Sequence, residues 1–138
     1  MLPNNPSSVL DQPFDAQHKA LRFYGAFFLY LLIIVLGSIP NARAEVGEFA
    51  SGFVLHTIAY AVITFLLATG SISRRGRALV QSLLTVVVMG ALDEYVQSYF
   101  PYRRASVEDW LVDGFASSLT ASLLWICAWF KFKRTNAI

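Results

Sequence analysis

Four long apolar runs constrain the fold of this chain more than any other feature. They cover about residues 21–39, 53–69, 79–95 and 110–130. A helix needs roughly 17–25 mostly apolar residues to cross the hydrocarbon core of a bilayer, and each run reaches or approaches that length. The connections between the runs are short, as in an up-down-up-down bundle. The sequence therefore predicts an all-α membrane protein with four transmembrane helices.

Composition favours lipid over water as the surroundings of these helices. Of the 138 residues, 56% are hydrophobic and only 14% are charged, whereas about a quarter of the residues in soluble domains are charged. The net charge of +2 is too small to indicate a nucleic-acid partner. The single cysteine, Cys127, excludes an internal disulfide and lies within an apolar run, so we expect it to be buried in the core.

The length allows one domain with short polar ends. We expect residues 1–20 to form a flexible cytoplasmic leader, residues 21–131 the four-helix membrane domain, and residues 132–138 a short basic cytoplasmic tail. The sequence Ala-Arg-Ala at 42–44 resembles a signal-peptidase site, and cleavage there would leave three helices. The long N-terminal region with Asp11 and Asp15 favours an uncleaved anchor helix instead.

The basic residues predict how the bundle is oriented. With four spans, the N-terminus, the second loop and the C-terminus share one side, which holds eight of the eleven Lys and Arg residues. The positive-inside rule places this side in the cytoplasm. We therefore expect both termini to be cytoplasmic. Seven of the nine acidic residues lie on the other, outer side. Because acids count little for topology, this skew points to function.

The outer ends of the second, third and fourth helices bring polar side chains together. Residues three or four apart share a helix face, and such pairs occur at 56 and 60, 94 and 97, and 109 and 113. The loop before the fourth helix adds two more. The candidate polar site consists of His56, Tyr60, Glu94, Gln97, Arg103, Ser106, Asp109 and Asp113. We expect Asp93, Arg104 and Glu108 to form its solvated rim.

These residue types have a chemical interpretation and a structural one. A histidine beside carboxylates can bind a metal or pass protons, and an arginine can hold a phosphate. The spacing matches no strong metal-ligand motif, so the sequence assigns no metal and names no cofactor. Alternatively, Asp109 caps its helix, His56 makes an interhelical hydrogen bond, and the cluster only keeps the helices in register. Membrane carboxylates also carry protons in transporters.

Three blocks of the chain resemble the VanZ-like family of small bacterial membrane proteins. The second helix has H-x-x-x-Y, here His56 and Tyr60. The third helix and its exit read E-x-x-Q-x-x-F-P-x-R over residues 94–103, and the fourth begins with Ser106 and Asp109. The resemblance covers about residues 21–129. Gly52 stands in place of an aspartate of the family pattern, residue 53 in place of a lysine, and residue 113 is Asp where Asn is usual.

The resemblance implies a multi-pass protein of the bacterial inner membrane. Its function is expected to be that of an accessory factor in the cell-envelope or glycopeptide (teicoplanin-type) antibiotic response. We expect the polar pocket to face outward and to bind a membrane lipid or a lipid-linked envelope precursor, which presents phosphate at that depth. The alternatives are a membrane-embedded hydrolase or transferase that acts on a lipid phosphate, and a purely structural membrane protein.

Overall fold

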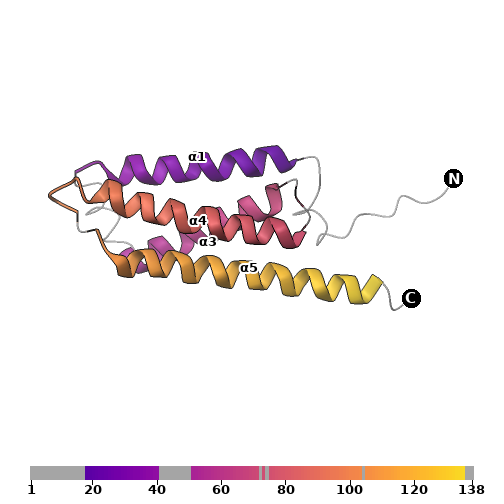
Figure 1. The fold of residues 1–138 in the computed structure, drawn as a ribbon. Helices are drawn as coiled ribbons and strands as arrows, with labels where there is room; N and C mark the ends of the chain where they lie inside the picture. The colour runs from indigo at the N-terminus through magenta and orange to yellow at the C-terminus, as the bar shows by residue number, and fades with distance from the viewer. Residues whose placement is uncertain (1–17, 41–50, 72, 74, 104, 136–138) are drawn as a thin grey trace.

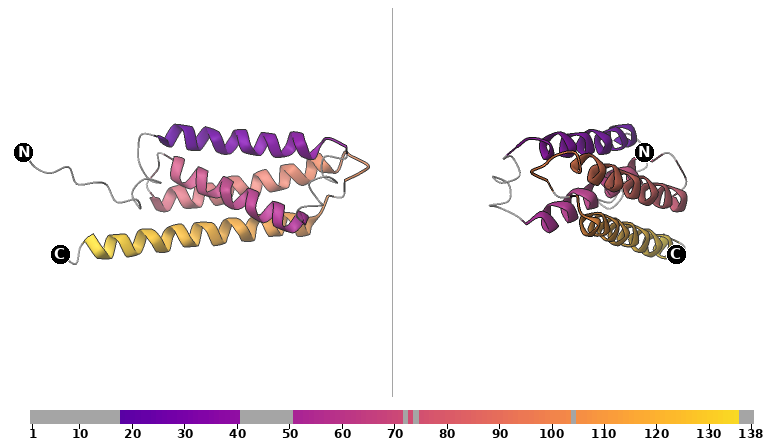
Figure 2. Two further views of the ribbon diagram at one scale, coloured as in Figure 1. Left: turned by 180° about the vertical axis from the view of Figure 1, so that it is seen from behind. Right: turned by 60° about the vertical axis from the view of Figure 1, so that its left-hand side comes forward.

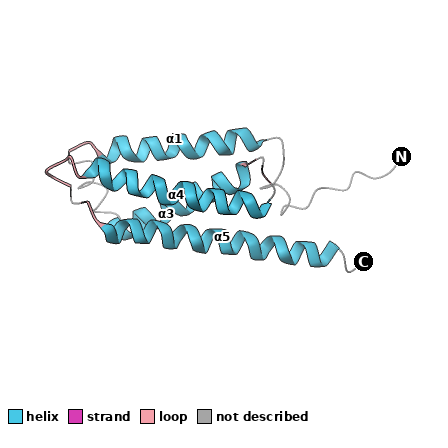
Figure 3. Ribbon diagram, viewed as in Figure 1, coloured by secondary structure: helices cyan, strands magenta, loops and turns pink. Residues whose placement is uncertain are grey.

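The structure is a computed structural model that describes residues 18–40, 51–71, 73, 75–103 and 105–135. Within these residues the chain is all-helical (Figures 1 and 3). The helices are α1 (Lys19–Gly37), α3 (Gly52–Gly70), α4 (Arg75–Gln97) and α5 (Val107–Thr135). These four helices of the described residues are long and apolar enough to cross a membrane, which confirms the predicted fold class at this level. The up-down passage through the membrane and the cytoplasmic termini stay predictions.

Polar residues set the helix bounds. The Ser51 side chain caps α3 by accepting the Val54 N–H at 3.4 Å. Helices α4 and α5 extend past the predicted runs, α4 beginning four residues before residue 79 and α5 ending five after residue 130. The predicted helices were too short because their bounds included only the apolar residues of each run. Lys133 and Arg134 continue the last turn of α5, where basic side chains interact favourably with the helix dipole.

Helix α3 contacts each of the other three helices. In both views of Figure 2, α3 and α4 lie between α1 and α5. The buried apolar core is small and gathers on α1, α3 and α4. Its members are Ala26, Tyr60, Ile63, Leu67, Val86 and Met89. The first turns of α3 and α5 and the last turns of α4 lie at one end of the bundle, and that end carries the predicted site.

Large apolar side chains cover much of the exterior. Phe28 is 69% exposed, Leu84 63% and Phe115 69%. Leaving such a side chain in water instead of burying it forgoes about 1.5–3 kcal/mol, whereas in lipid this penalty disappears. The prediction that Cys127 is buried was wrong, because its side chain is exposed. In a bilayer an apolar residue does not need a protein core around it.

Aromatic side chains are exposed toward both ends of the bundle, a distribution typical of membrane interfaces. Tyr95 and Tyr99 are exposed at the end of α4 and the turn after it, and Trp125 and Trp129 are exposed in the second half of α5. Trp110 has a further role: its indole N–H donates to the Val87 carbonyl at 3.0 Å, which ties the start of α5 to α4.

The predicted leader of residues 1–20 lies outside the described residues except for 18–20, and the last three residues of the predicted tail lie outside them as well.

Candidate functional site

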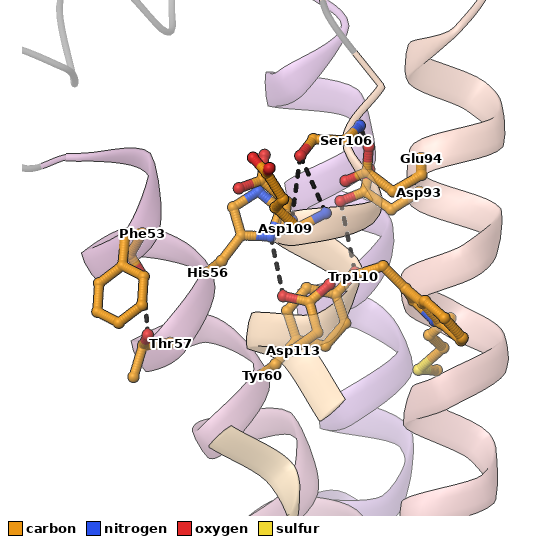
Figure 4. A network of polar contacts seen from close by, with 12 residues as sticks. Phe53, His56, Thr57, Tyr60, Asp93, Glu94, Ser106, Asp109, Trp110 and Asp113 are labelled. Carbon is orange, nitrogen blue, oxygen red and sulfur yellow. Dashed lines mark hydrogen bonds and ion pairs between the residues drawn. The ribbon is translucent and has the colours of Figure 1, made fainter. Parts of the chain in front are cut away.

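An oriented histidine lies where α3 meets α5. His56 Nδ1 is 2.9 Å from Asp113 Oδ1, and this contact joins the first turns of the two helices (Figure 4). The Asp113 side chain is 1% exposed and the His56 side chain 12%. Because a buried carboxylate holds one ring nitrogen, the other is presented in a defined direction. Figure 4 shows that this second nitrogen faces the Asp109 side chain.

Tyr60 and Asp93 lie one turn deeper in the bundle. The Tyr60 ring stacks on that of His56, with centroids 6.0 Å apart and an interplanar angle of 12°. The fully buried Tyr60 donates its hydroxyl to Asp93 Oδ2 at 3.4 Å. The prediction that Asp93 is solvated was wrong, because it is 3% exposed. Asp93 precedes Gln97 by four residues, so the same spacing rule that grouped the other pairs would have placed it on the inner face of α4.

Ser106 and Glu94 together begin α5. The Ser106 hydroxyl accepts the N–H groups of Glu108 and Asp109 at 3.1 and 3.2 Å, and the Ser106 N–H donates to Glu94 Oε2 at 2.5 Å. In a capping box, the acid three residues after the cap accepts the cap's own N–H. Here Glu94 of α4 accepts it instead. Asp109 is therefore not the cap of α5, and its carboxylate faces His56.

His56, Glu94 and Asp109 converge from three different helices. One ligand-type atom of each lies within 4.8 Å of the corresponding atoms of the other two. Figure 4 shows the three side chains around one common space at the end of the bundle. Residues that the sequence analysis paired by helical spacing on α3, α4 and α5 thus lie close together in the fold.

Arg103 belongs to the same end but lies toward α1. Its guanidinium lies against Gly37, where a Cβ atom would meet Nη2 at 3.5 Å. A cavity of about 310 Å³ opens here between α1 and α3. Its apolar walls include Ile33, Leu36, Leu55 and Ala59, and its polar lining includes His56, Tyr60, Asp93 and Arg103. The sequence showed no signal for this cavity, because α1 contributes only apolar side chains and Gly37.

Three buried polar groups of the site lack partners within the described part of the chain. They are the side-chain amide of Gln97, the carboxylate oxygen Oε1 of Glu94 and the carboxylate oxygen Oδ2 of Asp113. Buried polar atoms in folded proteins almost always have a hydrogen-bond partner. Gln97 is 3% exposed, yet no described hydrogen bond joins it to the other predicted residues. Such atoms mark a place where a bound group can complete the network.

The other two residues of the predicted solvated rim are Glu108 and Arg104. Glu108 is exposed on the first turn of α5, as predicted. Arg104 lies outside the described residues.

Comparison with protein-family models, with curated proteins and with solved structures finds no match. The resemblance to the VanZ-like family therefore stays a prediction that rests on the sequence blocks alone.

Proposed function

We propose that this chain is a VanZ-like, multi-pass protein of the bacterial inner membrane that binds an amphiphile with an anionic head group. The class of ligand is a membrane lipid or a lipid-linked envelope precursor that carries phosphate. The cellular role is that of an accessory factor in the cell-envelope or glycopeptide antibiotic response. Both termini are cytoplasmic in this proposal, and the pocket faces outward.

The cavity between α1 and α3 is the observation that carries the proposal. Its volume of about 310 Å³ lies at the lower end of the range for small-molecule pockets, roughly 300–1,000 Å³. The walls are mostly apolar, which suits an acyl or prenyl chain. Arg103 and His56 lie in the lining, and a guanidinium binds phosphate through paired, charge-assisted hydrogen bonds. An apolar cavity with the Arg103 guanidinium in its lining matches the two halves of a lipid phosphate.

A binding measurement with matched variants tests this function. We expect the purified full chain in nanodiscs to bind a polyprenyl phosphate, and Arg103→Gln to weaken that binding at least about tenfold, since hydrogen bonds to charged groups contribute roughly 1.5–3 kcal/mol. Ala59→Trp should weaken it by filling the apolar part of the cavity. Arg77→Gln and Ala91→Trp are the controls, because both positions are exposed on α4.

Equal affinity in wild type, Arg103→Gln and Ala59→Trp would rule the proposal out. The cellular role has its own readout with the same variants. Cells that depend on this protein for glycopeptide tolerance should lose that tolerance with Arg103→Gln while the protein remains at normal abundance in the membrane.

Hydrolysis of a lipid phosphate is a second candidate, favoured by the His56–Asp113 contact of 2.9 Å. A histidine held by a buried carboxylate can accept a proton from water as water attacks phosphorus. In a polyprenyl diphosphate, the bond between the terminal phosphorus and the bridging oxygen would break. The products would be inorganic phosphate and the polyprenyl monophosphate, and the proton taken from water would return to a product phosphate oxygen or to solvent. Phosphate release from a polyprenyl diphosphate by wild type, and its loss in His56→Ala, would favour this reaction over binding alone.

A further inference from the structure

We propose that His56, Glu94 and Asp109 form a binding site for one divalent transition-metal cation, with Asp113 as a positioning residue. One ligand-type atom from each of the three lies within 4.8 Å of the others. One imidazole nitrogen and two carboxylate oxygens form a mixed donor set that suits Zn²⁺ or Mn²⁺ better than the all-oxygen sites preferred by Ca²⁺.

The second coordination layer is already in place around the histidine. Metal-binding histidines usually direct the ring nitrogen that does not bind metal at a carboxylate or carbonyl, which fixes the ring orientation. His56 Nδ1 has this contact with Asp113 Oδ1 at 2.9 Å. The coordinating atom is then Nε2, on the side of the ring that faces Asp109 in Figure 4.

Glu94 provides an independent indication of a ligand. Glu94 is only 9% exposed, and its Oε2 atom accepts the Ser106 N–H. The other oxygen, Oε1, is buried and has no hydrogen-bond partner within the described part of the chain. A buried carboxylate oxygen requires a donor or a cation. A metal ion between Glu94 and Asp109 would supply one.

The charge of this end of the bundle also favours a cation. The side chains of the cluster and of the cavity beside it include four carboxylates, one histidine and one arginine. The carboxylates are Asp93, Glu94, Asp109 and Asp113. Carboxylates so close together repel one another where the dielectric constant is low. A bound divalent cation would be the largest local charge and would offset this repulsion.

The geometry requires small side-chain rotations rather than backbone movement. Zinc binds nitrogen and oxygen at about 2.0–2.2 Å, so ligand atoms around one ion lie roughly 3–3.5 Å apart. Rotation about the Asp109 and Glu94 side-chain bonds can bring their oxygens in from separations of up to 4.8 Å. The His56 side chain is 12% exposed and Asp109 is partly exposed, which leaves a coordination position accessible to water, as in catalytic rather than structural metal sites.

Metal binding to the untagged full chain tests this proposal. The protein is purified in detergent, stripped with a chelator and dialysed against Zn²⁺ or Mn²⁺, and bound metal is measured by elemental analysis. We expect about one ion per chain. His56→Ala, Glu94→Gln and Asp109→Asn should each weaken binding at least about tenfold, and Asp113→Asn should weaken it 10–100-fold, as for other second-layer partners. Glu108→Gln is the matched control, because Glu108 is exposed and adjacent to Asp109.

A spectroscopic measurement on the wild type does not depend on the folding of any variant. The chain contains two histidines, and His18 is exposed at the start of α1. The electron paramagnetic resonance spectrum of Cu²⁺ bound to the wild type should show coupling to an imidazole, and His18→Gln, which removes only the exposed histidine, should keep that coupling. Absence of saturable metal binding in the wild type, or absence of imidazole coupling, would overturn the proposal. So would equal metal binding by folded Asp109→Asn and Glu108→Gln. These metal-binding measurements use no lipid phosphate, so a negative result would not contradict the proposed lipid binding.

Discussion

At the scale of single residues, two buried aspartates differ in the polar partners that stabilise their carboxylates. Asp113 is paired with His56 at 2.9 Å, whereas the hydrogen bond that Asp93 receives among the described residues is the longer one from Tyr60, at 3.4 Å. Taking an ionised carboxylate out of water costs several kcal/mol, and an ion pair recovers this only with close geometry. Asp113 is therefore the more firmly held of the two, and His56 is the residue that holds it.

A double-mutant cycle on His56 and Asp113 tests this coupling. His56→Ala and Asp113→Asn should each lower the free energy of unfolding, and the double variant should lower it by less than the sum. We expect an interaction energy of about 1–3 kcal/mol, as for other residues in direct polar contact. The measurement is reversible unfolding in detergent micelles.

The exposed Glu108→Gln variant serves as the control in that cycle and should shift stability by no more than about 0.5 kcal/mol. Strict additivity of His56→Ala and Asp113→Asn would show that the contact contributes nothing. Conversely, complete loss of folding in Asp113→Asn would favour a purely structural role for the cluster.

At the scale of helices, two glycines allow close packing at opposite ends of the bundle. A Cβ atom on Gly70 would lie 2.5 Å from the Phe23 backbone nitrogen, so α3 and α1 touch backbone to backbone there. Gly90 leaves room on α4 for the Asp113 carboxylate and the Trp110 ring, each 3.0 Å from where a Cβ would be. Small residues replace the large apolar core that a soluble bundle would need.

Gly70→Ala should destabilise the bundle, because the clashing atoms are backbone and cannot rotate away. We expect a loss of about 1–3 kcal/mol in the free energy of unfolding, typical of overpacking. Gly25→Ala on α1 is the matched control, since a Cβ there meets nothing within 4 Å. That change should be neutral or stabilising by up to about 1 kcal/mol, because alanine is the better helix former. Similar unfolding curves for the two variants would contradict the close contact.

At the scale of the whole molecule, the two ends of the bundle differ in chemistry. One end carries the carboxylates, His56 and the cavity. The other end carries basic residues of α1 and α5, including Lys19 and Arg134. Because basic loops are retained in the cytoplasm, the polar site is proposed to face outward.

Cysteine labelling in intact cells tests this orientation. The only native cysteine is removed as Cys127→Ser, and a single cysteine is placed at Ala105 or at Ser73. A membrane-impermeant maleimide should label the Ala105→Cys protein in intact cells and the Ser73→Cys protein only after lysis. The reverse pattern would mean that the site faces the cytoplasm.

The sequence by itself determined that this chain has four membrane-length helices. A bilayer core fixes the length of an apolar helix and requires its backbone groups to be satisfied within the segment, so composition and run length are sufficient. Spacing by three or four residues also identified most of the polar site, because helix faces are a local property. His56 with Tyr60 and Asp109 with Asp113 follow from that rule alone.

Only the tertiary structure decided which faces meet and what lies between them. Helical spacing puts Asp93 on the same face of α4 as Gln97, but only the fold shows that this face turns toward α3 and is buried. Cys127 is exposed because its face of α5 turns outward. The cavity beside Arg103 depends on α1, whose side chains there carry no motif. The rotation of one helix against another is set by long-range contacts such as that of Gly70 with Phe23, and no local pattern encodes it.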